Sequence, residues 1–413
     1  MNIVPLWRNR EFVLLEAGQL LSTAGTQSTT IAYPLLVLAL THSPAKAGIV
    51  TFARLLPHAV FGLLAGVVAD RFNRKRLMIA ADGVRALAIG SLVMAILLDR
   101  LAFWQLPLVA FLEGTGSAFF SPASAGALRA LVPLRQLPAA VGAQQARAAT
   151  ARLAGPPLGG ALFGFGRAIP FVVDAASYAF STLALLMMRT PFQEIREIDT
   201  SRLRLQIAEG FRFLWRQPFL RTCAFLYALG NFVGPGVLLV IVVVGRRQGL
   251  SGGEIGALIA ASMLIGSLVS PLFRRAFSMR IILITELWTW LGCATFLIWP
   301  SVYVLTAGIL PSAISIPVTD SVVIGYRVAV TPDRLLGRVE SVRSNISLFI
   351  APLGPLTAGL LLASVSARAT ITVFAAFGLV LALWGTISPS IRNAPSLDEL
   401  EALPAHRTSS ALE

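Results

Sequence analysis

Long apolar stretches alternate with short polar segments along almost the whole chain. A membrane-spanning helix needs about 20 mostly apolar residues, and on that scale the pattern predicts about twelve spans. They cover residues 12–40, 48–69, 77–98, 104–128, 138–165, 168–188, 218–244, 254–273, 280–299, 301–327, 339–364 and 368–388. The pattern therefore predicts an all-α membrane protein.

Composition and charge support this prediction. Of the 413 residues, 56% are hydrophobic and only 13% are charged, which is too little polar surface to cover a water-soluble globule of this size. The net charge is +14, and most Lys and Arg residues fall before the first span, in the even-numbered loops and in the C-terminal tail. By the positive-inside rule, both termini are expected in the cytoplasm, and the same distribution argues against binding of nucleic acid.

Two short segments recur in the second half of the chain. Residues 66–75 are echoed by residues 266–275, with Ser270 in place of Asp70, and residues 155–160 are echoed by residues 354–359 at nearly the same separation. Such an internal repeat predicts two pseudo-symmetric six-helix bundles. The expected domains are an N-terminal bundle, a cytoplasmic linker with an amphipathic helix, a C-terminal bundle and a cytoplasmic tail, at residues 1–188, 189–217, 218–388 and 389–413.

The segment 66–76 joins a small-residue helix end to one acid and several bases. It resembles the signature between the second and third helices of the major facilitator superfamily. The resemblance implies a secondary transporter whose cytoplasmic gate is formed by Gly66, Asp70, Arg71, Arg74, Lys75 and Arg76. The alternative is that these bases only orient the loop toward the cytoplasm.

A second motif consists of Gly155, Pro156, Gly159 and Gly160. Its glycines permit close packing against a neighbouring helix. The motif resembles the signature of the antiporter branches of the superfamily, which implies export in exchange for protons. Two shorter runs, at residues 53–57 and 119–123, resemble the branch that contains bacterial enterobactin exporters and macrolide-efflux proteins.

Ionisable residues inside the predicted spans are the strongest functional markers, because a charge in hydrocarbon is costly without a partner or a cavity. Among them are Glu16, Arg54, Asp82, Arg85, Glu113, Arg147, Arg152, Asp174, Glu286, Asp320 and Arg343. The resemblance places the first, fourth, seventh and tenth helices around the transport cavity. We therefore expect Glu113 to couple proton movement, with Asp320 second and Glu16 third. Alternatively, each of these acids is the partner of a buried arginine.

Asp82 and Arg85 are three residues apart in one predicted helix, a spacing that favours a structural pair. Arg54, Arg147 and Arg152 fall in two spans of the first half, and a guanidinium binds planar anionic oxygens through a fixed fork. The three arginines therefore suggest an anionic or catechol-bearing substrate. Internal salt bridges to Glu16 and Glu113 are an equal alternative. Gln27 and Asn231 are further substrate-binding candidates, although such residues also make contacts between helices.

The sequence contains no phosphate-binding G-x-x-x-x-G-K-[ST] motif, no ligand-spaced His/Cys cluster and no nucleophile elbow. We therefore expect no enzyme activity, no metal and no cofactor, with the proton gradient as the energy source. The expected function is proton-coupled export of a small molecule, a siderophore or related metabolite, by a monomer in the bacterial cytoplasmic membrane. The alternatives are a polyspecific drug or macrolide efflux antiporter, and a membrane sensor or scaffold that transports nothing.

Overall fold

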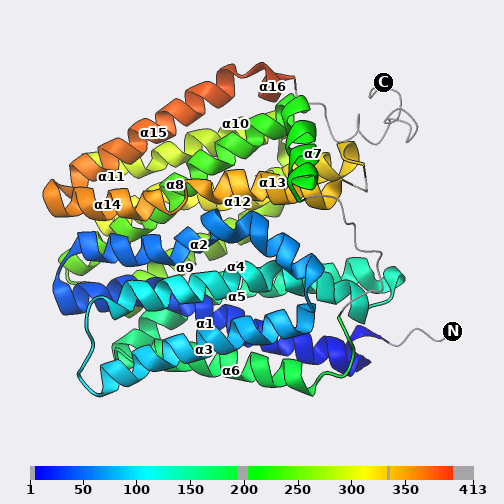
Figure 1. Cartoon of the computed structure of the whole chain (residues 1–413). Helices are drawn as coiled ribbons and strands as arrows, with labels where there is room; N and C mark the ends of the chain where they lie inside the picture. The colour runs from blue at the N-terminus through cyan, green and yellow to red at the C-terminus, as the bar shows by residue number, and fades with distance from the viewer. Residues whose placement is uncertain (1–4, 193–202, 333–334, 394–413) are drawn as a thin grey trace. The chain divides into compact units, whose positions relative to one another are not determined.

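The computed structural model describes residues 5–192, 203–332 and 335–393, and its described part is almost entirely helical. The chain forms two compact units. Unit 1 comprises residues 1–200 and 245–260, and unit 2 comprises residues 201–244 and 261–413. Figure 1 gives the helix labels that are used below.

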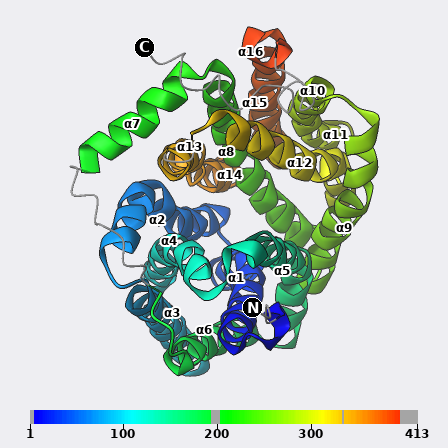
Figure 2. The ribbon, with the colours of Figure 1, turned by 90° about the vertical axis from the view of Figure 1, so that its right-hand side faces the viewer.

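Six long helices build the main part of unit 1. They are α1 (Arg10–Thr41), α2 (Pro44–Arg71), α3 (Arg74–Leu97), α4 (Gln105–Leu131), α5 (Leu137–Phe165) and α6 (Ile169–Met187). The short 3₁₀ helices η1 (Leu6–Arg8) and η2 (Leu134–Gln136) precede α1 and α5. In Figure 1 the axes of the six helices run roughly from left to right, and in Figure 2 the helices are seen close to end-on. Within the bundle, α1 packs on α5 and α6, α2 on α4, and α3 on α4 and α6.

Short polar residues start several of these helices. The side chains of Asn9, Ser43 and Asn73 accept hydrogen bonds from backbone N–H groups in the first turns of α1, α2 and α3. Such N-caps satisfy donors that have no partner inside the helix. Some connections between consecutive helices are very short. For example, α2 ends at Arg71 and α3 begins at Arg74.

The remaining helices belong mainly to unit 2. They are α7 (Leu203–Arg216), α8 (Pro218–Arg247), α9 (Gly252–Ala276), α10 (Met279–Thr289), η3 (Trp290–Ala294), α11 (Thr295–Ile298), α12 (Val302–Val330), α13 (Leu336–Phe349), α14 (Leu353–Ser364), α15 (Ala367–Ile387) and α16 (Pro389–Arg392). The end of α8 and the start of α9 fall within residues 245–260, which are grouped with unit 1.

Two of the predicted spans are interrupted. The span 280–299 consists of α10, η3 and α11, and the span 339–364 consists of α13 and α14. Pro352 stands at the second break, where a residue without an amide hydrogen cannot continue the hydrogen-bond ladder. At the first break, Gly292 of η3 lies against the backbone of Gly308 in α12, and a Cβ on either glycine would overlap the other residue's carbonyl oxygen.

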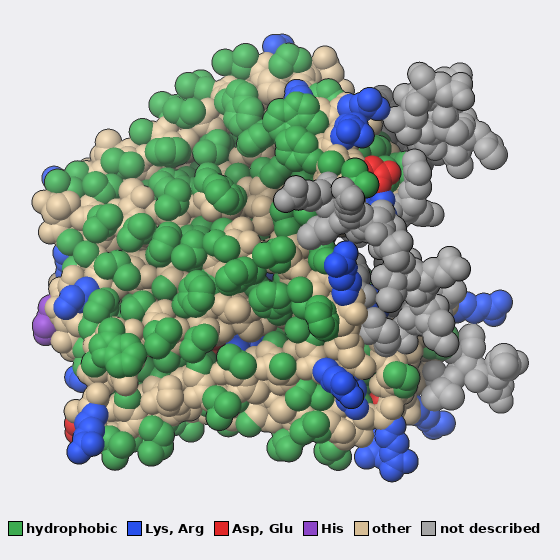
Figure 3. Space-filling view, in the orientation of Figure 1, with side chains coloured by type: hydrophobic (Ala, Val, Ile, Leu, Met, Phe, Trp, Pro, Cys, Tyr) green, Lys and Arg blue, Asp and Glu red, His purple; other side chains and the backbone are tan. Residues whose placement is uncertain are grey.

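Nine helical segments in the described part of the chain are long and apolar enough to cross a membrane. The helices α1, α4 and α5 are not among them, although each has the length of a span. Large apolar side chains are exposed along the helices, as for Leu87 on α3, Leu183 on α6 and Leu268 on α9. In the face shown in Figure 3, hydrophobic side chains cover the helices and Lys and Arg lie mostly toward their ends. The predicted all-α membrane fold is confirmed, with helices in each of the twelve predicted ranges.

Candidate functional site

Arg54 of α2 lies in a set of polar groups supplied by α1. Its Nη2 donates to the backbone oxygen of Thr26 at 2.8 Å and to Thr29 Oγ1 at 3.1 Å, and its Nη1 donates to Thr30 Oγ1 at 3.0 Å. The three threonines have the i, i+3, i+4 spacing that places side chains on one face of a helix. These threonines were not predicted as site residues, and the signal for them was a polar run in the middle of an apolar span.

Glu113 of α4 pairs directly with this arginine. Its Oε1 is 2.6 Å from Arg54 Nη2 and accepts a second hydrogen bond from Arg54 Nε at 3.2 Å. Only 2% of the Glu113 side chain and 12% of the Arg54 side chain are exposed. The next residue, Gly114, explains the short distance, because a Cβ there would overlap the carbonyl oxygen of Arg54. The absence of a side chain lets α4 approach the backbone of α2.

Two residues of α6 extend the same group. Asp174 is fully buried, and its Oδ2 lies 3.0 Å from Thr29 Oγ1. The hydroxyl of Tyr178 lies 2.6 Å from Thr26 Oγ1 and 3.5 Å from Glu113 Oε1. Helices α1, α2, α4 and α6 thus meet at one buried polar cluster, which is centred on Arg54.

The predicted pair of Asp82 and Arg85 is present on α3. The two side chains form a salt bridge, with 0% and 4% of their surfaces exposed. The Arg85 guanidinium also lies over the ring of Tyr178, at 4.3 Å from the centroid, and over the ring of Phe120, at 4.9 Å. Tyr178 therefore connects this ion pair to the cluster around Arg54.

The other arginines that were expected to bind an anion lie on α5. Arg147 forms a salt bridge with Glu16 of α1, with 3.0 Å between Nη1 and Oε2, whereas Arg152 is exposed. Of the two arrangements left open by the sequence, the structure shows the internal salt bridges. Arg54 binds Glu113, and Arg147 binds Glu16.

The glycines of residues 155–160 allow α5 to pack tightly on α1. A Cβ on Gly155 would overlap Gln27, and a Cβ on Gly159 would overlap the carbonyl oxygen of Ser28. Unit 2 uses the repeated motif in the same way, because a Cβ on Gly354 of α14 would overlap the carbonyl oxygen of Phe232 in α8. The repeat seen in the sequence therefore corresponds to a repeated helix contact.

The polar residues of unit 2 that the sequence suggested lie on three different helices. Asn231 of α8 donates from Nδ2 to the backbone oxygen of Ser347 at 3.0 Å and so connects α8 with α13. Asp320 of α12 is half-buried, and Glu286 of α10 is buried.

The bases of the segment 66–76 contact helix ends within unit 1. Arg74 donates to the backbone oxygens of Ala69 and Gly126, each at 3.3 Å, and Lys75 Nζ donates to the backbone oxygen of Met188 at 2.5 Å. Gly126 and Met188 stand at or near the C-terminal ends of α4 and α6, where a cation interacts favourably with the helix dipole. Arg71 and Arg76 are exposed and Gly66 is half-buried, while the side chain of Asp70 lies outside the described part of the structure.

The ion pairs of unit 2 gather around the first turns of α13. Glu340 binds both Arg327 at the end of α12 and Arg343, whose Nη2 is 2.8 Å from its Oε1. Arg338 forms a salt bridge with Glu209 of α7. The carboxylate side chains in these pairs are 37–40% exposed.

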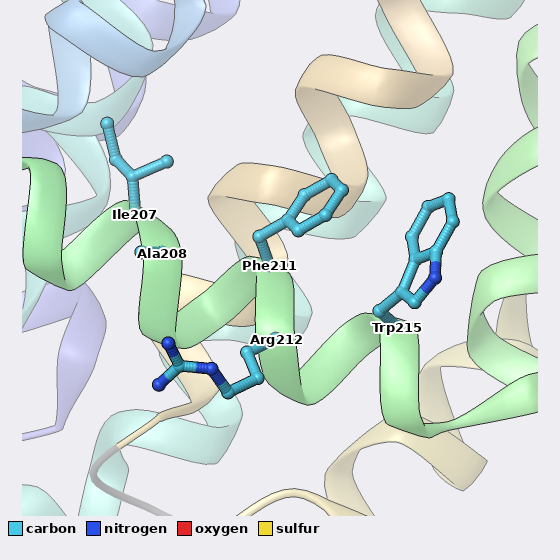
Figure 4. Close-up of a pocket in the computed structure, with 5 residues that line it drawn as sticks. All are labelled: Ile207, Ala208, Phe211, Arg212 and Trp215. Carbon is cyan, nitrogen blue, oxygen red and sulfur yellow. The ribbon is translucent and has the colours of Figure 1, made fainter.

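Helix α7 (Leu203–Arg216) has one face against α13 and one exposed face. One face lies against α13, where Leu214 is buried and a Cβ on Gly210 would come within 2.8 Å of the Arg338 carbonyl oxygen. The other face carries an open apolar pocket lined by Ile207, Ala208, Phe211, Arg212 and Trp215. Figure 4 shows the Phe211 and Trp215 side chains on one side of α7 and Arg212 directed to the other.

The structure gives no candidate metal site among the described residues, where no group of three His, Cys, Asp or Glu side chains is close enough to hold an ion.

Comparison with known proteins gives consistent matches over most of the chain. It is 29% identical over 408 residues to a multidrug efflux pump Tap of Mycolicibacterium fortuitum, covering 94% of this chain and 96% of that protein. It is 26% identical over 363 residues to macrolide efflux protein A of Streptococcus pyogenes, covering 83% and 87% of the two chains.

Among solved structures, a bacterial homologue of the human lysosomal transporter Spinster matches with a TM-score of 0.70 and 18% identity, over 93% of this chain and 97% of that one. A bacterial homologue of the iron transporter ferroportin, in an inward-facing state, matches with a TM-score of 0.69 and 18% identity, over 92% and 98%. At these identities the structures establish the fold alone. The family profile of the Major Facilitator Superfamily matches residues 15–286, which is more than half of the chain. The chain therefore belongs to the Major Facilitator Superfamily of membrane transporters.

Proposed function

We propose that this protein is a proton-coupled exporter of small organic molecules in the bacterial cytoplasmic membrane, working as a monomer by alternating access with both termini in the cytoplasm. The observation that carries the proposal is the buried pair of Arg54 and Glu113. Ionisable side chains inside a membrane bundle are costly and mark substrate or proton pathways. Protonation of Glu113 would remove its negative charge and release Arg54, so a proton could change which contacts stabilise the bundle. Asp320 and Glu16 are the second and third candidates for this role.

Polyspecific efflux of drugs, macrolides among them, is the substrate class that we favour. Arg54 and Arg147 each already bind a carboxylate, so neither guanidinium is available to attract an anionic substrate in this arrangement. The similar proteins are named for multidrug and macrolide efflux. Both observations favour neutral or cationic amphiphilic substrates over anionic ones.

Export of a siderophore or related metabolite is the second candidate. Arg152 is exposed on α5, one and a half turns after Arg147. A guanidinium at this position could bind anionic or catechol oxygens. Gln27 would then contribute hydrogen bonds, and Asn231 would do so if the substrate displaced its contact with the backbone oxygen of Ser347.

The proposal includes a gate on the cytoplasmic side of the protein. Gly66, Asp70, Arg71, Arg74, Lys75 and Arg76 would stabilise the closed state of the cytoplasmic side. During exchange, Gly155 and Gly159 would fix the packing of α5 on α1, and Pro156 and Gly160 its packing on the start of α9. The contacts of Arg74 and Lys75 with helix ends support a role in positioning this loop. The protein needs no cofactor for this cycle, because the proton gradient supplies the energy.

Efflux from cells tests the proposed function. Cells with and without the gene are compared for accumulation of ethidium and erythromycin, and for siderophores in the spent medium by mass spectrometry. We expect Glu113→Gln to abolish export with normal membrane levels of the protein. Glu254→Gln is the matched control, because Glu254 is an exposed carboxylate at the start of α9 that accepts hydrogen bonds from Ser251 in the next turn back. Equal export by the Glu113→Gln and Glu254→Gln proteins would contradict the proposal.

A further inference from the structure

The buried cluster of unit 1 contains more carboxyl groups than guanidinium groups. Its acids are Asp82, Glu113 and Asp174, and its bases are Arg54 and Arg85. All five side chains are buried or nearly so, within a helix bundle that lies in a membrane. A negative charge without a partner in such surroundings is strongly unfavourable. One of the three acids should therefore be protonated.

The hydrogen bonds single out Asp174. Glu113 and Asp82 each have an arginine as direct partner, whereas the side chain of Asp174 contacts the hydroxyl of Thr29. Each of the three acids has one buried oxygen without a hydrogen-bond partner among the described residues, and for Asp174 this is Oδ1. Gly25 presses against it, because a Cβ there would lie 2.5 Å from Oδ1. An ionised carboxylate normally accepts several hydrogen bonds, and this position offers very few.

The hydroxyl of Thr29 supports the same assignment. It accepts a hydrogen bond from Arg54 Nη2 at 3.1 Å, and it lies 3.0 Å from the backbone oxygen of Thr26 and 3.0 Å from Asp174 Oδ2. A hydroxyl has one hydrogen to donate and two lone pairs. In a helix that hydrogen commonly goes to a backbone oxygen of the preceding turn. The contact between Thr29 Oγ1 and Asp174 Oδ2 is then a hydrogen bond if the carboxyl group of Asp174 is protonated and donates to Thr29.

The other titratable groups around Asp174 fit this charge count. They are Tyr33 on α1, Arg54 and His58 on α2, Arg85 on α3, Glu113 on α4 and Tyr178 on α6 itself. The two tyrosines are neutral groups at ordinary pH. His58 lies one turn after Arg54, and the Nδ1 of His58 is buried without a hydrogen-bond partner. Arg54 and Arg85 lie near His58, so a positive charge on the His58 ring would be repelled by both guanidinium groups.

We propose that Asp174 and Glu113 share one proton, which resides on Asp174 in the arrangement seen here. While Asp174 holds it, Arg54 pairs with Glu113. When Glu113 holds it, Asp174 is the anion nearest to Arg54, reached through Thr29, and the net charge of the cluster is unchanged. Asp174, which the sequence did not single out, thus becomes a proton-binding residue of the exporter. This inference rests on the proposed function for its role in transport, but its structural part can be tested without transport.

Infrared spectroscopy of the full chain in lipid vesicles at neutral pH tests the protonation directly. A protonated carboxyl gives a C=O stretching band that a carboxylate lacks. We expect the difference spectrum between wild type and Asp174→Asn to contain this band. Growth on ¹³C-carboxyl aspartate should shift the band in the wild-type protein, which tests in the folded wild type whether the protonated group is an aspartate. Absence of the band from the difference spectrum, or a band that the label does not shift, would overturn the assignment.

Glu113→Gln tests whether the proton is shared. Removing this carboxylate leaves Asp82 and Asp174 with two arginines, so Asp174 should ionise and the labelled band should disappear. If Glu113→Gln keeps the band that Asp174→Asn removes, then Asp174 is protonated independently of Glu113, and the sharing is wrong. The readout needs no substrate. A failure of the proposed export function would appear only in the efflux assay and would leave these spectra as expected.

Discussion

Units 1 and 2 differ in where they hold their charged side chains. In unit 1 the described ion pairs are buried or mostly buried, with 2% of Glu113, none of Asp82 and 16% of Glu16 exposed. In unit 2 the described pairs lie at helix ends around α13, and Glu340 and Glu209 are 40% and 37% exposed. Exposed pairs contribute little to stability, whereas breaking a buried pair leaves an uncompensated charge. Unit 1 therefore carries the charges whose protonation can affect the whole bundle.

The two units agree in how their helices approach one another. Gly155 in unit 1 and Gly354 in unit 2, which correspond in the repeat, both lie against the neighbouring helix, Gly155 against Gln27 and Gly354 against the carbonyl oxygen of Phe232. The internal repeat has thus kept the close contacts and has changed the charges. Asp70, for example, corresponds to Ser270, whose hydroxyl donates to the backbone oxygen of Gly266 at 2.6 Å.

The largest effect is expected from Arg54→Gln. This change leaves Glu113 buried without its cation, and breaking a buried pair typically costs about 3–5 kcal/mol. We expect a large loss of thermal stability in detergent, measured by melting of the purified protein. The double variant Arg54→Gln/Glu113→Gln should recover much of this loss, since no charge is left alone. A double variant as unstable as the single one would show that the pair does not act as a unit.

Glycine substitutions test the similarity of the units. Gly155→Val and Gly354→Val should each destabilise their unit by about 1–3 kcal/mol, because overpacking forces the helices apart. Gly164→Val on α5 is the control, as nothing lies within 4 Å of its added Cβ. The measurement is the melting temperature of each of the three variants relative to the wild-type protein. A strong effect at only one of the two motif positions would mean that the repeated contact is not equivalent in the two units.

Glu340→Gln should have a small effect on stability. The carboxylate is 40% exposed and solvent screens its pairs with Arg327 and Arg343, so we expect at most about 1 kcal/mol. Melting in low and high salt provides the measurement, and the difference from wild type should shrink as salt is added. A loss as large as that of Arg54→Gln would remove the contrast between the units.

The smallest effect on stability is expected at the exposed face of α7. Phe211 and Trp215 are 43% and 44% exposed, and their rings stack with centroids 5.1 Å apart. An amphipathic helix with aromatic residues and arginines favours a membrane surface. A fluorophore on a cysteine at position 211, with Cys223 and Cys293 replaced by serine, should be quenched by brominated lipids. The same label at position 209, where Glu209 contacts Arg338, should be quenched less.

Much of the fold could be predicted because its determinants are local. Span lengths follow from hydropathy, and the tight packing at residues 155–160 follows from the size of glycine. The breaks within the spans 280–299 and 339–364 were not predicted. Pro352 was a signal for the second break, while the first depends on the contact of Gly292 with Gly308, which only the tertiary structure brings together.

The candidate site was predicted only in part for the same reason. Glu113 and Arg54 were identified as costly intramembrane charges, and their pairing was one of two alternatives. The contributions of Thr26, Thr29 and Asp174 depend on how α1 and α6 are rotated against α2 and α4, which the sequence pattern does not determine. Arg74 and Lys75 were assigned to a gate, and their contacts with the ends of α4 and α6 become visible only when the six helices are assembled.

Proton movement in reconstituted vesicles tests the central claim most directly. The purified protein is placed in vesicles that contain a pH-sensitive dye, and erythromycin or ethidium is added in the presence of a proton gradient. The account predicts substrate-dependent proton flux for the wild-type and Glu254→Gln proteins and none for Glu113→Gln. Substrate transport that proceeds at the same rate without a proton gradient, or proton flux that survives in Glu113→Gln, would contradict it.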